Sequence, residues 1–219
     1  MSKPSPKQQL FAQLARAGKG IAHPSRLELI EAMAQGEKSV EALSRACGLA
    51  FSNVSHHLQI LKDCGLAVSR KEGLQVFYRL ADAEIPKMLA ALRRVAERQL
   101  AEVERIVRDN FESRDALQPV RRDELLKMAR RGEAVVIDVR PEEEYEAGHI
   151  AGAINVPIES LPRFLKKLPK EQDVVAYCRG PYCMLAFEAV DKLRKKGYRA
   201  RRLEEGFPEW QAERLPVDK

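Results

Sequence analysis

The chain has 219 residues, of which 45% are hydrophobic and 32% charged, and its formal net charge is +6. This composition is typical of a soluble globular protein of one or two domains. No apolar run approaches the 18 residues that a membrane-spanning helix needs, and the N-terminus lacks the apolar region of a secretory signal. These features predict a cytoplasmic protein without a membrane partner.

The basic excess lies in the first half of the chain. Residues 1–110 hold 17 Lys and Arg against 12 Asp and Glu, whereas residues 111–219 hold 21 against 20. This distribution is expected if only the first half meets an anionic polymer such as DNA. Ordinary solubilising surface charge is the alternative, and charge alone does not decide between the two.

Short helices followed by a β-hairpin are predicted for the first half. A proline in the first turn starts a helix at residues 23–25, and Gly65 ends a later one in a left-handed conformation. Two β-prone runs flank a short turn at residues 71–74 and predict the hairpin. The expected helices lie near 10–17, 27–33, 40–43 and 52–64, the last with an inner face of Val54, Leu58 and Leu61, and the strands at 66–70 and 75–80.

A long helix is predicted from residue 83 to residue 110. Its apolar positions, from Ile85 to Ile106, recur at alternating steps of four and three, although Ala96 and Gln99 weaken the pattern. This is the spacing of a coiled coil. Because so small a domain cannot bury a stripe of this length, a homodimer is the expected state. A helix that packs back on its own domain is the alternative.

Strands that alternate with helices are predicted for the second half. This order is typical of a small α/β domain with a mainly parallel sheet, in which ligands sit at the carboxyl ends of strands. The chain then divides into a domain at 1–110, a linker at 111–118 and a domain at 119–219. The expected strands lie near 134–139, 173–177 and 200–203, and the helices near 122–131, 159–168 and 184–196.

The loop from Cys178 to Cys183 is the strongest candidate for a reactive site. Cys178 follows the apolar run 174–177, and the positive end of the helix predicted from residue 184 points into the loop. Such a field favours thiolate, the reactive form of sulfur, so Cys178 is predicted to be an anion open to small sulfur species. The four cysteines of the chain are too few and too unevenly spaced for a disulfide scaffold.

Residues 8–108 resemble the ArsR-type winged-helix repressors, through the segments AHPSRL (22–27), NVSHHL (53–58) and YRL (78–80). The resemblance implies an α+β winged helix-turn-helix domain that binds a double-stranded DNA operator. His57 is expected to be buried and hydrogen-bonded. For the segment as a whole, the alternative is a winged helix that binds protein instead of DNA. The predicted DNA contacts are Ser52, Asn53, Ser55, His56 and Gln59 on the recognition helix, and Arg70 and Lys71 on the wing.

ArsR-type repressors often sense metals through two cysteines in the helix before the recognition helix. Here that helix, SVEALSR (39–45), has no thiol. Cys47 and Cys64 flank the recognition helix, but two thiols alone do not complete a metal shell. They are interpreted as small buried hydrophobic residues, with a thiol pair that responds to oxidants or sulfur as the alternative. No metal site and no cofactor is predicted.

Residues 118–215 resemble the rhodanese domain, through the segments VIDVR (136–140), GHI (148–150), INVP (154–157) and EGF (205–207). The resemblance implies an α/β fold in which a nucleophilic Cys178 carries sulfane sulfur as a persulfide. Asp138, Arg140 and His149 are expected to hold the surrounding loops by charge-assisted hydrogen bonds rather than to take part in the chemistry.

The loop departs from the usual rhodanese pattern, which resembles C-R-x-G-x-R-S. Arg179 matches, whereas Pro181 replaces a glycine, Cys183 the second arginine and Met184 a small hydroxyl residue. Loss of that cation predicts weak thiosulfate turnover. Cys183 could instead attack a Cys178 persulfide and form a disulfide. The alternative is that Cys183 is a buried structural residue in the first turn of the helix. The predicted substrate loop comprises Gly180, Pro181, Tyr182 and Met184.

Three functions follow from these features. The favoured one is a homodimeric transcriptional repressor whose rhodanese-like domain senses persulfide, polysulfide or thiosulfate through Cys178. The second is a sulfurtransferase tethered to a DNA-binding module. The third is an arsenic- or metal-responsive repressor that uses Cys178 and Cys183. The first is favoured because a DNA-binding unit is fused to a sulfur-carrying thiol with altered substrate-binding residues.

Overall fold

A computed structural model of the chain describes residues 4–111 and 119–219. The chain forms two compact units, Met1–Pro86 and Lys87–Lys219. The predicted linker at 111–118 lies outside the described residues, apart from Phe111. In these two ranges no helix is long and apolar enough to cross a membrane.

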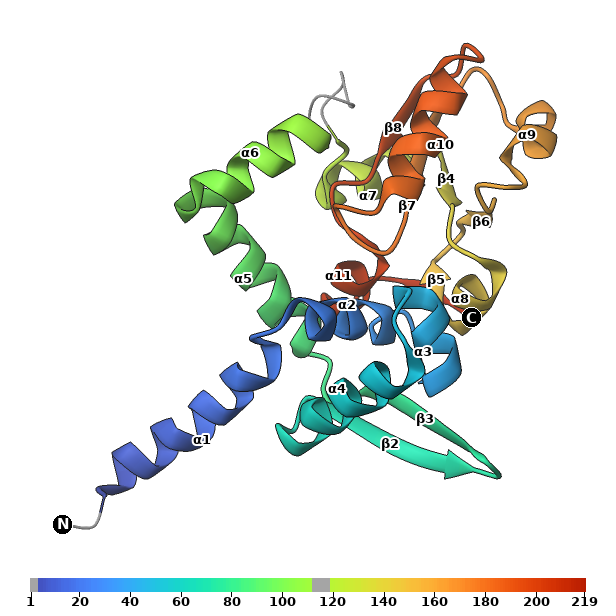
Figure 1. The fold of residues 1–219 in the computed structure, drawn as a ribbon. Coiled ribbons are helices and arrows are strands. Elements are labelled where there is room, and N and C mark those ends of the chain that lie inside the picture. The colour runs from blue at the N-terminus through green and yellow to red at the C-terminus, as the bar shows by residue number, and fades with distance from the viewer. Residues whose placement is uncertain (1–3, 112–118) are drawn as a thin grey trace. The chain divides into compact units, whose positions relative to one another are not determined.

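The first unit consists of short helices followed by a β-hairpin, as predicted (Figure 1). The hairpin strands pair antiparallel, and a short strand before the third helix joins them in the order β1–β3–β2. The elements are α1 (Pro6–Ile21), α2 (Pro24–Met33), β1 (Lys38–Ser39), α3 (Val40–Cys47), α4 (Phe51–Asp63), β2 (Ala67–Glu72) and β3 (Gln75–Leu80).

Two predicted helix ends in this unit are confirmed. His23 precedes α2, and its Nδ1 accepts a hydrogen bond from the Ser25 amide at 3.1 Å, while Pro24 occupies the first turn. Gly65 follows α4 with a φ of 76°. Only glycine adopts this left-handed conformation without a steric penalty, so the residue type fixes where α4 ends.

The α4 helix presents one apolar face to the core. Val54, Leu58 and Leu61 are each fully buried, as their spacing predicts. Burial of this face leaves the opposite face of α4 free to meet a partner.

Ser39 caps α3, the helix before α4. Its Oγ accepts a hydrogen bond from the Ala42 amide at 3.1 Å. Replacing Ser39 with alanine is expected to lower the free energy of unfolding of the first unit by about 1 kcal/mol, because an N-terminal amide of α3 loses its partner. Urea unfolding followed by circular dichroism measures this. Ser52→Ala, on the exposed face of α4, should change stability by less than about 0.5 kcal/mol, and equal losses in the two variants would contradict the capping role.

The prediction of one long helix at 83–110 is wrong, because the helix breaks at Leu100. Two helices replace it, α5 (Ile85–Gln99) and α6 (Ala101–Asn110). Leu100 between them has extended backbone angles, with φ of −113° and ψ of 103°. The break directly follows Gln99, one of the two residues that weaken the apolar spacing. A straight coiled coil across the whole segment is therefore excluded for this conformation.

The second unit contains a parallel sheet whose strands run in the order β6–β4–β7–β8. The predicted α/β architecture is confirmed. Besides α5 and α6, its elements are α7 (Arg122–Arg130), β4 (Ala134–Asp138), α8 (Glu142–Ala147), β5 (His149–Ile150), β6 (Ile154–Asn155), α9 (Leu161–Phe164), the 3₁₀ helix η2 (Leu165–Lys167), β7 (Asp173–Tyr177), α10 (Met184–Arg194), β8 (Ala200–Arg202), α11 (Phe207–Ala212) and β9 (Val217–Asp218).

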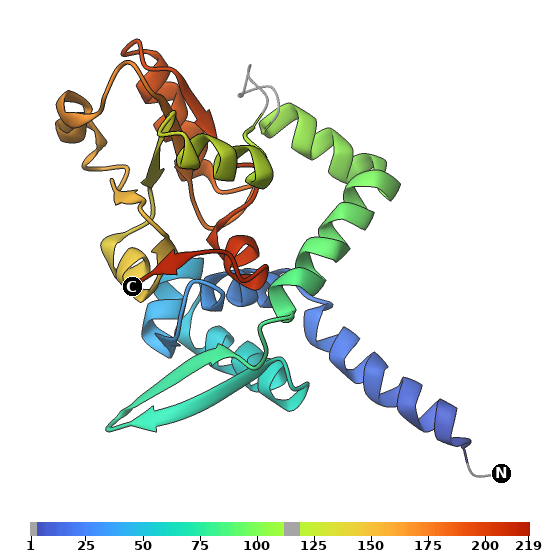
Figure 2. The ribbon, with the colours of Figure 1, turned by 180° about the vertical axis from the view of Figure 1, so that it is seen from behind.

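Helices cover both faces of this sheet. One apolar cluster joins α9 and α10 to Val174, Ala176 and Cys178, and the other joins α7 and α11 to Val175 and Tyr177. Figure 1 shows α10 in front of the sheet, and the reverse view in Figure 2 shows α7 in front. Because side chains alternate along a strand, β7 sends neighbouring residues into two separate cores.

Candidate functional site

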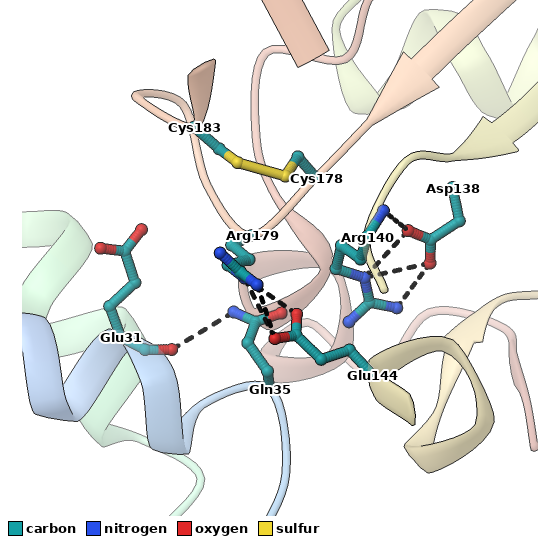
Figure 3. Close-up of a disulfide and its surroundings, with 8 residues drawn as sticks. All are labelled: Glu31, Gln35, Asp138, Arg140, Glu144, Cys178, Arg179 and Cys183. Atoms are coloured by element: carbon teal, nitrogen blue, oxygen red, sulfur yellow. Dashed lines mark hydrogen bonds and ion pairs between the residues drawn. A yellow bond between two sulfur atoms is a disulfide. The ribbon is translucent and has the colours of Figure 1, made fainter. Parts of the chain in front are cut away.

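Cys178 follows the last residue of β7, at the carboxyl end of the parallel sheet, as the sequence predicts. Five residues later, Cys183 is the N-cap of α10. A disulfide joins the two, with their Cα atoms 6.1 Å apart (Figure 3). This separation is normal for a disulfide. Strand end and helix start thus bring the two cysteines together, which spacing alone does not establish.

The expectation of an open Cys178 thiolate is wrong for this bridged state. Cys178 is only 1% exposed, and its sulfur is bonded to that of Cys183. The Cys183 amide donates to the Gly180 carbonyl at 3.1 Å rather than to a sulfur. A disulfide carries no charge, so loop amides have no anion to stabilise here. Any reaction of Cys178 with a small molecule requires the reduced loop.

Arg179 makes a bidentate ion pair with Glu144. Its Nη2 lies 2.8 Å from Oε1 and its Nε 2.9 Å from Oε2, as Figure 3 shows. Glu144 belongs to α8 and is buried. A guanidinium held by a buried carboxylate offers less net positive charge to an anionic ligand than a free one. Arg179 therefore orients the loop in this arrangement, and Glu144 is a site residue that the sequence analysis missed.

Asp138 and Arg140 form a buried network beneath the loop. Both side chains are fully buried, and Arg140 Nη2 lies 2.6 Å from Asp138 Oδ2. Arg140 also donates to the Gly148 carbonyl at 2.8 Å, and the Tyr177 hydroxyl donates to Asp138 Oδ2 at 2.6 Å. Burial and then the Asp138 carboxylate raise the pKa of Tyr177, so it is a neutral donor. This geometry suits the structural role predicted for Asp138 and Arg140.

Gly206 lies against the backbone of the loop. A Cβ built on it would lie 2.4 Å from the Arg179 carbonyl carbon and 2.4 Å from the Gly180 nitrogen. The next residue, Phe207, donates its amide to the Cys178 carbonyl at 3.0 Å. Only a residue without a side chain fits here. The segment EGF contains Gly206, but its contact with the loop could not be foreseen from the sequence.

The remaining predicted site residues surround this core. Gly180, Pro181, Tyr182 and Met184 are all half-buried in the loop and the first turn of α10. His149 is buried, and its ring stacks on Tyr145 with 3.6 Å between centroids. His149 Nδ1 also lies 3.0 Å from the Tyr145 carbonyl oxygen. The structure thus brings the loop residues together and places His149 in the framework at β5.

The predicted DNA-contacting residues lie mostly on the exposed face of α4. Arg70 on β2 is exposed but engaged, because it lies 2.6 Å from Glu37 and also pairs with Glu72. A phosphate would have to compete with these carboxylates for Arg70. Ser52, Asn53, His56 and Gln59 on α4 are exposed, as is Lys71 on β2, and Ser55 is half-buried.

His57 is half-buried and packs on His23, with 4.4 Å between ring centroids. Burial, followed by the neighbouring charges of His23, Arg26 and His56, lowers its pKa, which favours the neutral ring. Its Nδ1 has no hydrogen-bond partner among the described residues. The expected burial is thus partial, and the expected hydrogen bond is missing at this nitrogen.

Cys47 and Cys64 are each half-buried rather than buried as predicted. Within residues 4–111 and 119–219, no three His, Cys, Asp or Glu side chains are grouped so that they could hold a metal ion.

Two family models match the chain. That of the bacterial regulatory protein arsR family matches residues 23–69, and that of the rhodanese-like domain matches residues 121–213. The first match covers α2 to β2, and the second covers the parallel sheet with the cysteine loop. The two matches define the class of protein: a helix-turn-helix of the arsR type joined to a rhodanese-like domain.

Known relatives agree with this architecture. The chain is 42% identical over 212 residues to the HTH-type transcriptional regulator Rv0324 of Mycobacterium tuberculosis (strain ATCC 25618 / H37Rv), which covers 97% of this chain and 93% of that relative. The chain therefore belongs to the ArsR family of bacterial regulators and carries a rhodanese-like domain. The domain limits expected at 110 and 119 stay a prediction.

Two solved structures are similar to parts of the chain. One is the homodimeric winged helix-turn-helix DNA-binding domain Mb0332 from Mycobacterium bovis, 36% identical with a TM-score of 0.41, covering 46% of this chain and 93% of that chain. The other is a rhodanese-related protein from Thermoplasma volcanium, 26% identical with a TM-score of 0.42, covering 47% of this chain and 98% of that chain.

Proposed function

We propose that this ArsR-family regulator is a repressor in which reactive sulfur species oxidise Cys178 and Cys183 to a disulfide, and that the disulfide changes operator affinity. One observation carries the proposal. The two cysteines are bridged where β7 ends and α10 begins, in a chain that also holds a DNA-binding unit. Disulfides are rare in reducing compartments and are usually redox-sensing or catalytic there. The bridge is therefore interpreted as one state of a switch.

The sulfur chemistry balances without a further oxidant. The Cys178 thiolate attacks the outer sulfur of a persulfide RSSH, RS⁻ leaves, and Cys178 becomes a persulfide. The Cys183 thiolate then attacks the Sγ of Cys178, HS⁻ leaves, and the disulfide forms. Two thiols and RSSH thus give a disulfide, RSH and H₂S, and the donor accepts both electrons. Cys183 is the N-cap residue of α10, and the positive end of the helix dipole there favours the thiolate that the second step requires.

Sulfur transfer from thiosulfate is expected to be slow. Thiosulfate is an anion, and the cation of the loop, Arg179, is already paired with the buried Glu144. Cys183 also occupies the position that holds the second arginine in the pattern resembling the rhodanese loop. A bridged pair further removes the nucleophile from turnover until a reductant opens it. The enzyme function therefore ranks below the switch.

The DNA partner proposed is a double-stranded operator read by α4. Its exposed serine, asparagine, histidine and glutamine side chains can hydrogen-bond to phosphates and base edges in a major groove. Lys71 adds a cation on the wing. Phosphate contacts make such binding depend strongly on salt.

A second copy of the chain is the proposed partner for the exposed apolar residues of the helices. On α1, Leu10, Phe11 and Leu14 are each more than half exposed. On α5, Leu92 is 42% exposed and Val95 is 50% exposed. Exposed apolar patches on neighbouring turns are typical of protein interfaces. The similar domain from Mycobacterium bovis is described as homodimeric, which supports this arrangement.

Operator affinity at fixed salt, measured by fluorescence anisotropy with and without a polysulfide donor, tests the proposal. For the wild type we expect a change of about 5- to 150-fold, the usual range of allosteric coupling, reversed by dithiothreitol. Cys178→Ser should abolish the response. Cys183→Ser should accumulate a persulfide on Cys178 without a bridge, which mass spectrometry detects.

Two results would contradict the switch. One is an operator affinity of the wild type that the donor leaves unchanged although the bridge forms. The other is a Cys178 thiol that iodoacetamide cannot alkylate in the reduced protein, because the proposed chemistry needs the reduced loop to expose this sulfur. Rapid steady-state turnover of thiosulfate, lost in Cys178→Ser, would favour the sulfurtransferase instead.

A further inference from the structure

Tyr182, inside the cysteine loop, is held by residues of α5 and of the end of α6. Its hydroxyl donates a hydrogen bond to the Glu97 carboxylate. The Arg93 guanidinium lies 5.7 Å from the centre of its ring, and the Phe111 ring lies 4.9 Å away between centroids. A hydroxyl on a carboxylate and a cation over an aromatic face both stabilise a contact. The segment between the two cysteines is therefore attached to α5.

A second set of contacts joins the loop to the same helix. Gly206 fits against the backbone of Arg179 and Gly180, and its amide donates to Glu209 Oε2 at 3.1 Å. Glu209 Oε1 in turn accepts from Arg93 Nη1 at 3.2 Å, and these side chains are 14% and 22% exposed. Arg93 thus takes part in both sets of contacts between the loop and α5.

Open space lies beside this contact. A hollow of about 470 Å³ is lined by Pro181 of the loop and by Arg93, Arg94 and Glu97 of α5, among others. Tightly packed interiors resist rearrangement, whereas a loop that borders a hollow can move without displacing a core. The loop therefore has open space beside Pro181.

We propose that Arg93 and Glu97 are positioning residues for the thiol pair, which they hold through Tyr182 in the arrangement that permits the Cys178–Cys183 bridge. This inference rests on the proposed function and deepens it. The proposal requires the Tyr182 contact to be stronger in the bridged protein than in the reduced protein, and by linkage the contact then stabilises the bridge by the same free energy. Bridging therefore attaches α5 to the rhodanese-like domain, and reduction weakens that attachment.

The midpoint potential of the Cys178–Cys183 pair tests this reciprocity. The full-length protein is equilibrated in dithiothreitol buffers of graded ratio, and free thiols are counted by alkylation and mass spectrometry. Tyr182→Phe removes the hydrogen bond and Glu97→Gln removes the charge of its acceptor, so each should shift the thiol–disulfide equilibrium toward the dithiol, by up to about tenfold. For a two-electron couple a tenfold shift makes the potential about 30 mV more positive.

Two comparisons separate positioning from general destabilisation. The double variant should shift no further than the single variant with the larger effect, because both substitutions act on the same Tyr182–Glu97 contact. Tyr198→Phe removes a different hydroxyl, bonded to the Leu165 carbonyl away from the loop, and should leave the potential unchanged.

In the wild type, amide hydrogens of α5 should exchange more slowly in the bridged protein than in the reduced protein.

Unchanged potentials in Tyr182→Phe and Glu97→Gln, or equal exchange of α5 in the two redox states, overturn the inference. The proposed function then stands if the wild type still forms the bridge with polysulfide and changes its operator affinity. If the wild type forms no bridge with polysulfide, the proposed function itself fails. The variants and the exchange of α5 therefore test the inference, and bridge formation and operator affinity of the wild type test the proposed function.

Discussion

Replacing Asp138 with alanine is expected to lower the free energy of unfolding of the second unit by about 3–5 kcal/mol, the usual cost of removing one partner of a buried ion pair. The side chains of Asp138 and Arg140 are both fully buried. The variant leaves the Arg140 guanidinium in the core without its carboxylate, and the Tyr177 hydroxyl loses the same acceptor. Trp210, the single tryptophan, is buried in α11, so its fluorescence during urea unfolding reports on this unit.

A salt bridge on the surface of the same unit provides the control. Glu124 lies 2.6 Å from Arg201, but the two side chains are 41% and 25% exposed. Exposed pairs contribute about 0.2–1 kcal/mol, so Glu124→Gln should cost no more than that. The hydrogen bond from Arg201 lowers the pKa of Glu124. The pair therefore adds to the free energy of unfolding at neutral pH, and this contribution is lost in acid when Glu124 is protonated. At pH 7, equal losses for Asp138→Ala and Glu124→Gln would contradict the structural role of the buried network.

Gly206→Ala is expected to displace the cysteine loop. The added methyl group would lie 2.4 Å from backbone atoms of Arg179 and Gly180, and backbone cannot yield as a flexible side chain can. Overpacking of this kind costs about 1–3 kcal/mol. The backbone angles of Gly206 are extended, with φ of −102°, so the effect arises from crowding and not from torsional strain. We expect lower stability by tryptophan fluorescence and slower bridge formation with polysulfide.

Gly18→Ala is the matched control, because a methyl group there meets nothing within 4 Å. Gly18 lies inside α1, where alanine is favoured over glycine by about 0.5–1 kcal/mol. This variant should therefore be stable and should bridge at the wild-type rate. A Gly206→Ala protein with unchanged stability and bridging would show that the loop tolerates a displacement of its backbone.

Local patterns predicted most of the fold. The spacing of Val54, Leu58 and Leu61 gave the buried face of α4, and the β-prone runs gave β4, β7 and the hairpin, because each pattern depends only on neighbouring residues. The break at Leu100 was missed, since neither glycine nor proline marks it. The short strands β5, β6 and β9 were also missed, because two residues carry no period and their pairing depends on distant segments.

The site was predicted in part. Cys178 and Arg179 followed from the loop pattern, whereas the partner of Arg179, Glu144, comes from α8 and depends on tertiary structure. The same holds for Gly206 and for the contact of Tyr182 with Glu97. The bridge itself depends on the distance between two loop ends, which no spacing rule fixes. The buried state of Cys178 was missed because the prediction assumed a reduced thiol.

The alternation along β7 separates two tasks at consecutive positions. Tyr177 points into the core that holds the ion network, whereas Cys178 belongs to the opposite core and opens the reactive loop. Substitutions in the loop between Cys178 and α10 are therefore expected to disturb the framework of the domain less than substitutions of Asp138 or Arg140. A protein engineer could therefore vary Pro181 inside the loop, provided that Cys178, Cys183, Tyr182 and the supporting residues Asp138, Arg140 and Gly206 are kept.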